Sequence, residues 1–458
     1  MLTRRAFTSL VSAGLAAAPQ GGIAATPTAS SRRQEAESLV RFAETTHPDG
    51  LAARNDPKWR AQARDLIAKA DALDEARYPV AALGLLSWFR DGHTGVNGPA
   101  LHEGVWGFRF PLGVTLFSDG LYVTAAKDEA MPLLGARVTH VAGAPVESVI
   151  RRFAAIWPAV SVAGPHRWSI LLLRSAGFLN GLGFANGAAG TPVAIEGVLP
   201  DGALTRASIR PRPDGAQNLT ALAHPQSDLE RYTATQNYGP QPDLTEDGRN
   251  FVWLRDGGKI LFVSLDRMSD DDFGKPFAVF RQEFLAALEA PGAERLIIDL
   301  RRNGGGDNML CEGLRKHIQR SRFNRPGGLI VLISPHTFSA AQNLANRLER
   351  ECFAFFVGEP TGSSPNHCGD AKIFDAAATK IPAQVSTLRW QDSNPRDTRT
   401  AIMPDLMVPS RFSDYAAGRD VALEAALQVV DSREPDDEIL TAPWKRQSQQ
   451  QVWRPFWM

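Results

Sequence analysis

The chain has 458 residues, too many for one ordinary hydrophobic core, so we expect two or three domains. Fifty basic and fifty acidic residues cancel, so no net charge draws the chain to nucleic acid or to an anionic membrane. Beyond its first residues, no apolar run is long enough for a transmembrane helix. We therefore expect a globular protein with no nucleic-acid partner and no stable membrane span.

We predict an export signal peptide over residues 1–25. Arg4 and Arg5 precede an apolar stretch, and small residues at 23–25 offer a cleavage site. The paired arginines followed by Phe7 resemble a twin-arginine export signal. No cysteine lies near the cleavage region, which argues against a lipoprotein anchor. The signal predicts a periplasmic or secreted protein.

Three further regions precede the part of the chain that we expect to carry catalysis. Residues 31–105 are predicted to be helical, since apolar side chains such as Val80 and Leu83 recur at helical spacing. Residues 108–211 hold short apolar runs separated by glycines, a pattern typical of β-strands. Residues 212–250 are polar and rich in Pro and Gln, which predicts a linker or a surface excursion.

Residues 251–430 alternate apolar runs with amphipathic segments. We expect strands at 260–265, 296–300, 329–333 and 353–357, and helices near 273–288, 309–318 and 339–349. This βαβαβαβ order predicts an α/β fold with a parallel sheet covered by helices. Sites in such sheets lie beyond the carboxyl ends of the strands. Residues 431–458 form a tail, first acidic and then rich in Gln and Trp. Trp444, Trp453 and Trp457 either pack back on the body or mark a contact surface, and the sequence does not choose between the two.

Ser339 follows one of these strands and begins a helix. One interpretation is a helix N-cap. The other is a nucleophile, because the N–H groups of Ala340 and Ala341 at the helix start can stabilise an oxyanion. Gly304–Gly306 follow the neighbouring strand, where they form either a tight turn or a backbone that approaches a ligand closely. Placed beside Ser339, this glycine run would complete an oxyanion hole.

A serine nucleophile needs a base. Three of the nine histidines lie in suitable places: His93 in a Gly-flanked turn, His336 just before Ser339, and His367 after the last predicted strand. Sequence spacing does not choose among them, because catalytic triads are assembled by the fold. Glu359 ends a strand at the same sheet edge, where it would orient a histidine, contact substrate or be a solvated acid.

The three cysteines leave two arrangements open. Cys352 and Cys368 could form a disulfide in an oxidising compartment and leave Cys311 free, or all three could be separate thiols. No spacing of Cys and His resembles a zinc site, so we expect no metal.

Several of these segments resemble, in the same order, the motifs of the S41 serine peptidases, which include the C-terminal processing proteases and the tricorn core protease. The matching segments are DGHT at 91–94, LIIDLRRNGGGD at 296–307, FSAA at 338–341, VGEPTG at 357–362, PDL at 404–406 and GRD at 418–420. They correspond to the family's DxHT, IIDLRxNGGGD, nucleophile, GExTxG, PD and GRD elements. The resemblance spans roughly residues 75–430 and is firmest over 258–425.

The resemblance implies an α/β fold with a ClpP/crotonase-like βαβ core sheet. It implies that Ser339 is the nucleophile and that the backbone N–H groups of Gly304, Gly305 and Ala340 form the oxyanion hole. The processing proteases use a lysine base, but Ser364 stands at the matching position. No lysine occurs between residues 316 and 372, which disfavours a Ser–Lys dyad.

The tricorn-like branch uses a histidine base with a supporting glutamate. The resemblance therefore implies that His93 is the base and that Glu359 orients it. The tricorn site also has a serine just before its histidine. This chain has Gly92 there, and Thr94 is the hydroxyl that would replace it.

Residues 108–211 lie where many family members carry a PDZ-like domain, and residues 133–146 resemble its sequence pattern. Such a domain implies a packing module, a site that captures a peptide C-terminus, or a gate over the active site. The resemblance as a whole implies an exported serine endopeptidase that acts on peptides or polypeptides without a metal or organic cofactor. Ligand binding without turnover and hydrolysis of other esters or amides stay open, as does the oligomeric state.

Overall fold

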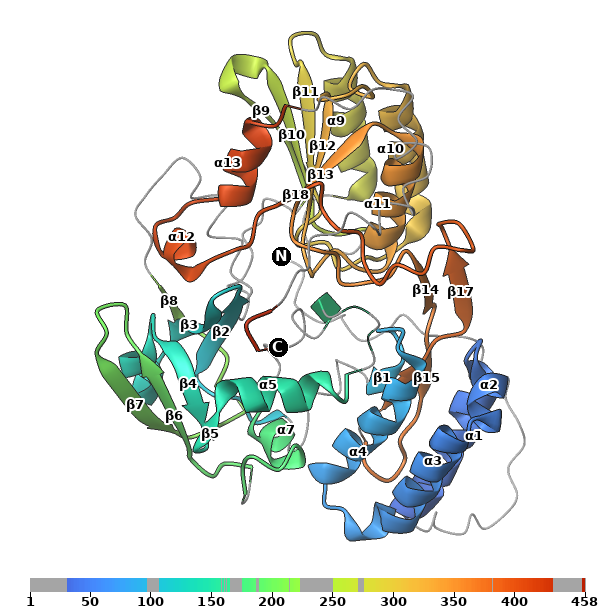
Figure 1. The fold of residues 1–458 in the computed structure, drawn as a ribbon, viewed down its shortest axis with the longest axis vertical. Coiled ribbons are helices and arrows are strands. Elements are labelled where there is room, and N and C mark those ends of the chain that lie inside the picture. The colour runs from blue at the N-terminus through green and yellow to red at the C-terminus, as the bar shows by residue number, and fades with distance from the viewer. Residues whose placement is uncertain are drawn as a thin grey trace, which may run out of the picture.

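A computed structural model describes residues 31–96, 107–157, 159, 161, 163–164, 175–186, 189–213, 215–222, 250–270, 276–380, 382–430 and 455–457. The predicted signal peptide, residues 223–249 of the predicted linker and residues 431–454 of the tail lie outside this described part. Figure 1 shows an upper α/β region, a β-rich domain at lower left and a group of helices at lower right.

The first region is helical, as predicted. Its helices are α1 (Arg32–Thr46), α2 (Gly50–Asn55), α3 (Pro57–Lys69) and α4 (Arg77–Leu86), with short 3₁₀ turns at Ala70–Ala72 and Ser87–Phe89. Ser31 and Gln34 form a capping box at the start of α1, and Asp56 accepts from Lys58 N at the start of α3. Trp59 is fully buried and meets Phe89 edge to face, which packs these helices around their own core.

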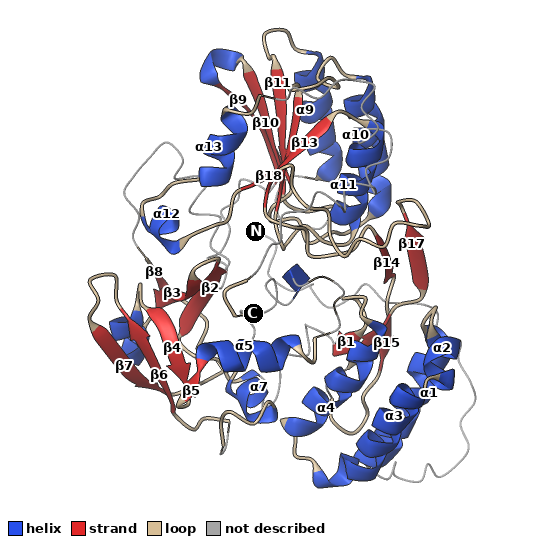
Figure 2. Ribbon diagram, viewed as in Figure 1, coloured by secondary structure: helices blue, strands red, loops and turns tan. Residues whose placement is uncertain are grey.

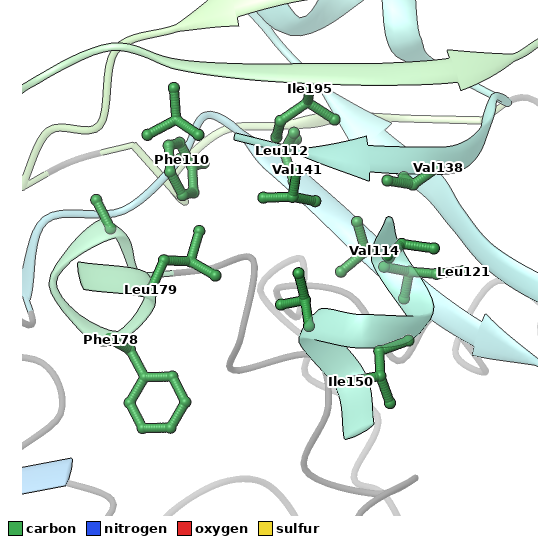
Figure 3. Close-up of a cluster of buried hydrophobic side chains, with 14 of the residues drawn as sticks. Phe110, Leu112, Val114, Leu121, Val138, Val141, Ile150, Phe178, Leu179 and Ile195 are labelled. Carbon is green, nitrogen blue, oxygen red and sulfur yellow. The ribbon is translucent and has the colours of Figure 1, made fainter. Parts of the chain in front are cut away.

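The β-rich domain is an antiparallel sheet with the order β2-β3-β4-β6-β7, and β5 and β8 pair at its side. Its strands are β2 (Leu112–Phe117), β3 (Gly120–Ala126), β4 (Arg137–Val141), β5 (Ala144–Pro145), β6 (Val193–Val198), β7 (Leu204–Ile209) and β8 (Thr220–Ala221). A 3₁₀ turn (Asp128–Leu133) and the helices α5 (Val146–Ala154) and α7 (Ala176–Gly181) complete it. Figure 3 shows side chains from the strands and from both helices meeting in one apolar core.

The boundary of this domain lies further along the chain than the sequence predicts. Arg212 pairs with Arg109, and β8 pairs with β3. The described residues of 212–222, which we predicted to begin a linker or a surface excursion, therefore pair with the β-rich domain.

The α/β region has a six-stranded sheet in the order β18-β13-β12-β11-β10-β9 (Figures 1 and 2). Its strands are β9 (Asn250–Arg255), β10 (Ile260–Leu265), β11 (Arg295–Asp299), β12 (Leu329–Ile333), β13 (Ala354–Gly358) and β18 (Leu406–Met407). The helices are α9 (Phe277–Glu289), α10 (Asn308–Arg320), α11 (Ala340–Glu351), α12 (Phe412–Ala416) and α13 (Val421–Leu427). The strands from β10 to β13 and β18 are parallel, as predicted, and only β9 runs antiparallel.

Apolar side chains cover both faces of this sheet. One cluster joins alternate strand residues to α9, α10 and α11, and a second joins the other face to α13. Burial on both faces explains why the strand at 329–333 is an unbroken apolar run rather than an alternating one.

The strands after β13 were not predicted. β14 (Asn366–Gly369) pairs with β17 (Leu388–Gln391), and β15 (Lys372–Phe374) pairs with β16 (Ala383–Val385). β16 also pairs antiparallel with β1 (Gly95–Val96), almost 300 residues earlier in the chain. This pairing joins the N-terminal region to the strands that follow β13.

A buried ion-pair network braces the sheet's carboxyl edge. Arg301 donates to the carboxylates of Asp299 and Asp420, at 2.7 Å in each pair. Burial alone would lower the pKa of Arg301, but the two carboxylates raise it well above its usual value. The network ties the 296–307 motif to the 418–420 motif.

All three cysteines are free thiols, so the predicted alternative of a Cys352–Cys368 disulfide is wrong. Among the described helices, none is long and apolar enough to cross a membrane.

Candidate active site

Ser339 lies in a strained turn between β12 and α11. Its backbone has φ 54° and ψ −124°, a conformation that only glycine adopts without cost. Ser339 occupies the N-cap position of α11, as one interpretation predicted, but its side chain makes no capping hydrogen bond to the helix. A strained strand-to-helix turn of this kind presents a serine hydroxyl at the top of a sheet.

The glycine run after β11 lies directly against this serine. A Cβ atom placed on Gly305 would lie 2.5 Å from Ser339 Cβ, 3.0 Å from Ser339 Oγ and 2.9 Å from Ala340 N. Gly305 also has φ +107°. Glycine is required here for both reasons, and its missing side chain leaves the space beside the hydroxyl open.

The backbone N–H groups around Ser339 differ in their partners. Gly305 N–H donates to Asn303 Oδ1 at 2.9 Å, and Asn303 in turn donates to Leu265 O. Within the described residues, the N–H groups of Gly304 and Ala340 make no hydrogen bond. Gly304 is exposed, and Ala340 opens α11. The two unengaged donors are therefore Gly304 and Ala340, while Gly305 as an oxyanion donor stays a prediction.

The structure places His93 next to this turn. Its ring stacks on Phe338, the residue before Ser339, with ring centroids 4.5 Å apart and planes 25° apart. His93 therefore approaches the nucleophile from a different region of the chain, across the aromatic ring that precedes it.

Asp91 holds the His93 loop. Its Oδ1 accepts from the backbone N–H groups of His93 (2.7 Å) and Thr94 (2.6 Å), and its Oδ2 accepts from the Thr94 hydroxyl. Burial raises the pKa of Asp91, but the hydrogen bond from His47 and the charge of His93 outweigh burial and hold that pKa below its usual value. Asp91 is therefore an ionised carboxylate that accepts four hydrogen bonds and holds the loop of the candidate base.

His47 supplies the fourth hydrogen bond. Its Nδ1 accepts from Asp49 N at 2.9 Å, so the proton lies on Nε2, which donates to Asp91 Oδ2 at 2.8 Å. The ring is buried and lies 4.0 Å from the Phe89 ring. His47 was not among the predicted site residues, because the sequence shows only a histidine in the connection between two helices.

Residues in and directly after β16 also hold the His93 loop. Gln384 Nε2 donates to His93 O at 2.8 Å, and Ser386 N donates to the Thr94 hydroxyl at 3.0 Å. Thr94, predicted to replace the missing serine of the tricorn-like site, thus acts on the loop backbone through Asp91 and Ser386.

His367 also lies at the site, but its chemistry differs from that of His93. It is in β14, 4% exposed, and its ring stacks on His93 at 5.5 Å. Its Nδ1 donates to Ser364 O at 3.1 Å. Burial, together with the charge of His93, lowers the pKa of His367 to about 4. A group with that pKa is neutral and weakly basic at pH 7, so it is poorly matched to general-base work.

Two further predicted residues have described contacts of their own. Glu359 is buried, lines a small cavity with Arg301 and Asp420, and accepts from Ser410 Oγ at 3.1 Å. His336 is half-buried, and its N–H donates to Ser334 Oγ.

One group of side chains resembles a metal site. The ligand atoms of His47, Asp49 and Cys368 lie within 4.8 Å of one another. However, both ring nitrogens of His47 are hydrogen-bonded, and the Asp49 carboxylate is paired with Arg389 at 2.6 Å. Because the guanidinium already supplies the positive charge there, the arrangement favours an ion pair over a bound cation.

Comparisons with known proteins place this geometry in context. No protein-family model and no curated protein matches the sequence. The structure matches mature CPAF with a TM-score of 0.58 at 14% identity, over 87% of this chain and 95% of that chain. It matches mature CPAF complexed with lactacystin with a TM-score of 0.56 at 15% identity, over 86% of this chain and 97% of that chain.

A third match is the photosystem II D1 C-terminal processing protease, with a TM-score of 0.39 at 14% identity over 86% of this chain and 99% of that chain. The conclusion on the fold rests on the two CPAF structures. The chain has the fold of the S41 serine peptidases. This confirms the resemblance that the motifs indicated.

Proposed function

We propose that this chain is an exported serine endopeptidase that cleaves peptide bonds through an acyl-enzyme. One juxtaposition carries the proposal: a serine in a strained turn lies against a glycine without a side chain and at the start of a helix, with His93 stacked beside it. The S41 fold supports peptide hydrolysis as the reaction class.

In this mechanism Ser339 Oγ attacks the carbonyl carbon of the scissile peptide bond, and His93 takes the hydroxyl proton. The N–H groups of Gly304 and Ala340 stabilise the oxyanion of the tetrahedral intermediate. The intermediate then collapses, and His93 gives its proton to the leaving amine. His93 then deprotonates a water molecule, which attacks the acyl ester, and the proton passes from His93 to Ser339 Oγ as the ester bond breaks. These steps need no metal or organic cofactor.

Two carboxylates are candidates for supporting His93. Asp91 fixes the backbone of its loop, while Glu359, which the family resemblance suggests, makes its described hydrogen bond to Ser410. If Glu359 orients the imidazole in the substrate complex, Glu359→Gln lowers kcat as strongly as Asp91→Asn. If Asp91 is the main support, Asp91→Asn has the larger effect.

The test of the function is labelling of the mature protein with a fluorophosphonate probe. We expect the wild-type protein to label, Ser339→Ala to show no labelling, and His93→Ala to label at least about 10²-fold more slowly. Thermal melting shows that the variants are folded. A folded wild-type protein that does not label contradicts the proposal and favours a binding protein on the same scaffold. Casein, short peptides and simple esters, assayed in parallel, then distinguish an endopeptidase from another hydrolase.

Two further parts of the proposal concern location and substrate delivery. We propose export through the twin-arginine signal, which predicts that replacing Arg4 and Arg5 by lysines retains the precursor inside the cell.

We also propose that the β-rich domain is PDZ-like and presents peptide to the site. A deletion of that domain that leaves ester hydrolysis intact but abolishes peptide hydrolysis supports this role.

A further inference from the structure

A short segment near the end of the chain is buried in the β-rich domain. Residues 455–457 are described, and the preceding described residue is Val430. Pro455 is buried, Phe456 is half-buried, and Trp457 is only 3% exposed. Three consecutive residues are thus covered by a domain that the chain left about 230 residues earlier.

Trp457 is a member of that domain's apolar core. The other members of the buried cluster run from Val80 to Ile209, and among the described residues only Trp457 comes from beyond Ile209. Figure 3 shows Ile150 of α5 in this core beside residues of the sheet. The Phe456 ring packs against the cluster and meets the Trp457 ring edge to face at 5.6 Å.

One polar contact fixes the segment's backbone. Arg151, on the exposed side of α5, donates from Nη1 to the carbonyl oxygen of Trp457 at 2.9 Å. The neighbouring buried face of α5 carries Val149, Ile150 and Phe153. A cation on a main-chain carbonyl beside a cluster of apolar side chains can hold a peptide segment, because it fixes the backbone while one aromatic side chain is buried.

We propose that α5 and the adjoining sheet form a binding site for a peptide with paired aromatic residues, and that the segment 455–457 of this chain occupies that site as an internal ligand. A ligand that belongs to the same chain competes at an effective concentration of about 1 mM. The site is then closed to free peptide until the segment leaves. This inference rests on the contacts of residues 455–457 and not on the proposed peptidase activity.

The test measures binding and not catalysis. The probe is a fluorescein-labelled peptide with the sequence of residues 452–458, and its anisotropy is followed with the full chain and with a chain that ends at Arg454. We expect saturable 1:1 binding to the shortened chain and at least about tenfold weaker binding to the full chain. A peptide in which the residue matching Trp457 is alanine should bind at least about tenfold more weakly.

Arg151→Ala in the shortened chain should weaken binding several-fold, whereas Arg152→Ala, on the exposed side of the same helix, should leave binding unchanged. Failure of the folded, shortened chain to bind the peptide overturns the proposal. Equal binding by both chains overturns it as well, because the segment then does not compete.

A second design keeps the folded protein intact if the shortened chain does not fold. A specific protease site is inserted after Val430, and the folded full chain is cut there. Exchange of the cut segment for excess labelled peptide supports a ligand site. Retention of the cut segment against excess peptide identifies Trp457 as a permanent part of the core and overturns the proposal.

Discussion

The two sides of the candidate site are built in opposite ways. The Ser339 side is local, because a strand, a loop of three glycines and a helix start lie within about 50 residues of one domain. The His93 side is assembled from three distant segments, namely the α1–α2 connection, the loop before β1 and the end of β16. The nucleophile itself has a strained backbone, whereas the candidate base lies in a loop that is held by hydrogen bonds. Perturbing each side should therefore give different signatures.

The largest effect is expected from closing the space beside the nucleophile. Gly305→Ala places a Cβ atom 2.5 Å from Ser339 Cβ, so the turn must move. We expect a loss of about 10³-fold in kcat/KM, because both the hydroxyl and the Ala340 N–H shift. Hydrolysis of a small ester substrate measures it.

Gly202→Ala is the matched control. Gly202 also has a positive φ, of +87°, but no atom lies within 4 Å of its Cβ position. It carries the same conformational cost without the collision. Equal activity in the two variants contradicts the close approach of the glycine loop.

The second effect concerns the base side and pH. The pKa of His367 is about 4 in the folded protein against 6.5 unperturbed, so between these values the unfolded chain binds the extra proton. The contribution of neutral His367 to the free energy of unfolding is therefore fully present above pH 6.5 and is lost as the pH falls toward 4. We expect this loss to lower the free energy of unfolding by roughly 3 kcal/mol across that window.

Urea unfolding of the wild type and of His367→Asn at pH 7, 5.5 and 4 measures this contribution. Other carboxylates also titrate in this range, so the difference between the two slopes is the readout. Equal slopes show that His367 is not held neutral by its burial.

The local side of the site was largely predictable from the sequence, and the distant side was not. The turn at Ser339 and the loop at Gly304–Gly306 follow from strand endings in a parallel sheet, since all such strands end at one edge. The role of His47 depends on the pairing of β1 with β16, two strands almost 300 residues apart, and the spacing of a single sequence carries no signal for it.

The fold shows the same division. β10 and β12 were predicted with their observed bounds because each is a short, fully buried apolar run. β14 to β17 are only three or four residues long and contain no continuous apolar run, so their pairing depends on tertiary context that periodicity and propensity do not reveal. The strain at Ser339 was missed because a serine before a helix has the sequence of an ordinary cap.

The third prediction separates support of the base from contact with substrate. His47→Phe retains the ring that packs on Phe89 but removes the donor to Asp91 Oδ2. A hydrogen bond to a buried charge is worth about 2 kcal/mol, so we expect kcat to fall about 30-fold. KM should not change, because His47 is buried and its hydrogen bonds go to Asp91 and Asp49.

His317→Phe, on the exposed surface of α10, is the control for the same exchange of side chains. A normal kcat in His47→Phe shows that Asp91 holds the loop without His47. A large change in KM places His47 in contact with substrate and contradicts a positioning role.

The smallest effect tests the strain itself. Ser339 has φ 54° and ψ −124°, which glycine adopts freely and alanine does not. Both Ser339→Ala and Ser339→Gly remove the hydroxyl and should abolish labelling, but only Ser339→Gly relieves the backbone. We expect Ser339→Gly to exceed Ser339→Ala in free energy of unfolding by about 1 kcal/mol, measured by urea titration. If the two variants are equally stable, the turn is not strained in solution. The two sides of the site would then not differ in backbone strain. The accessibility of the Ser339 hydroxyl would depend on the glycine loop alone.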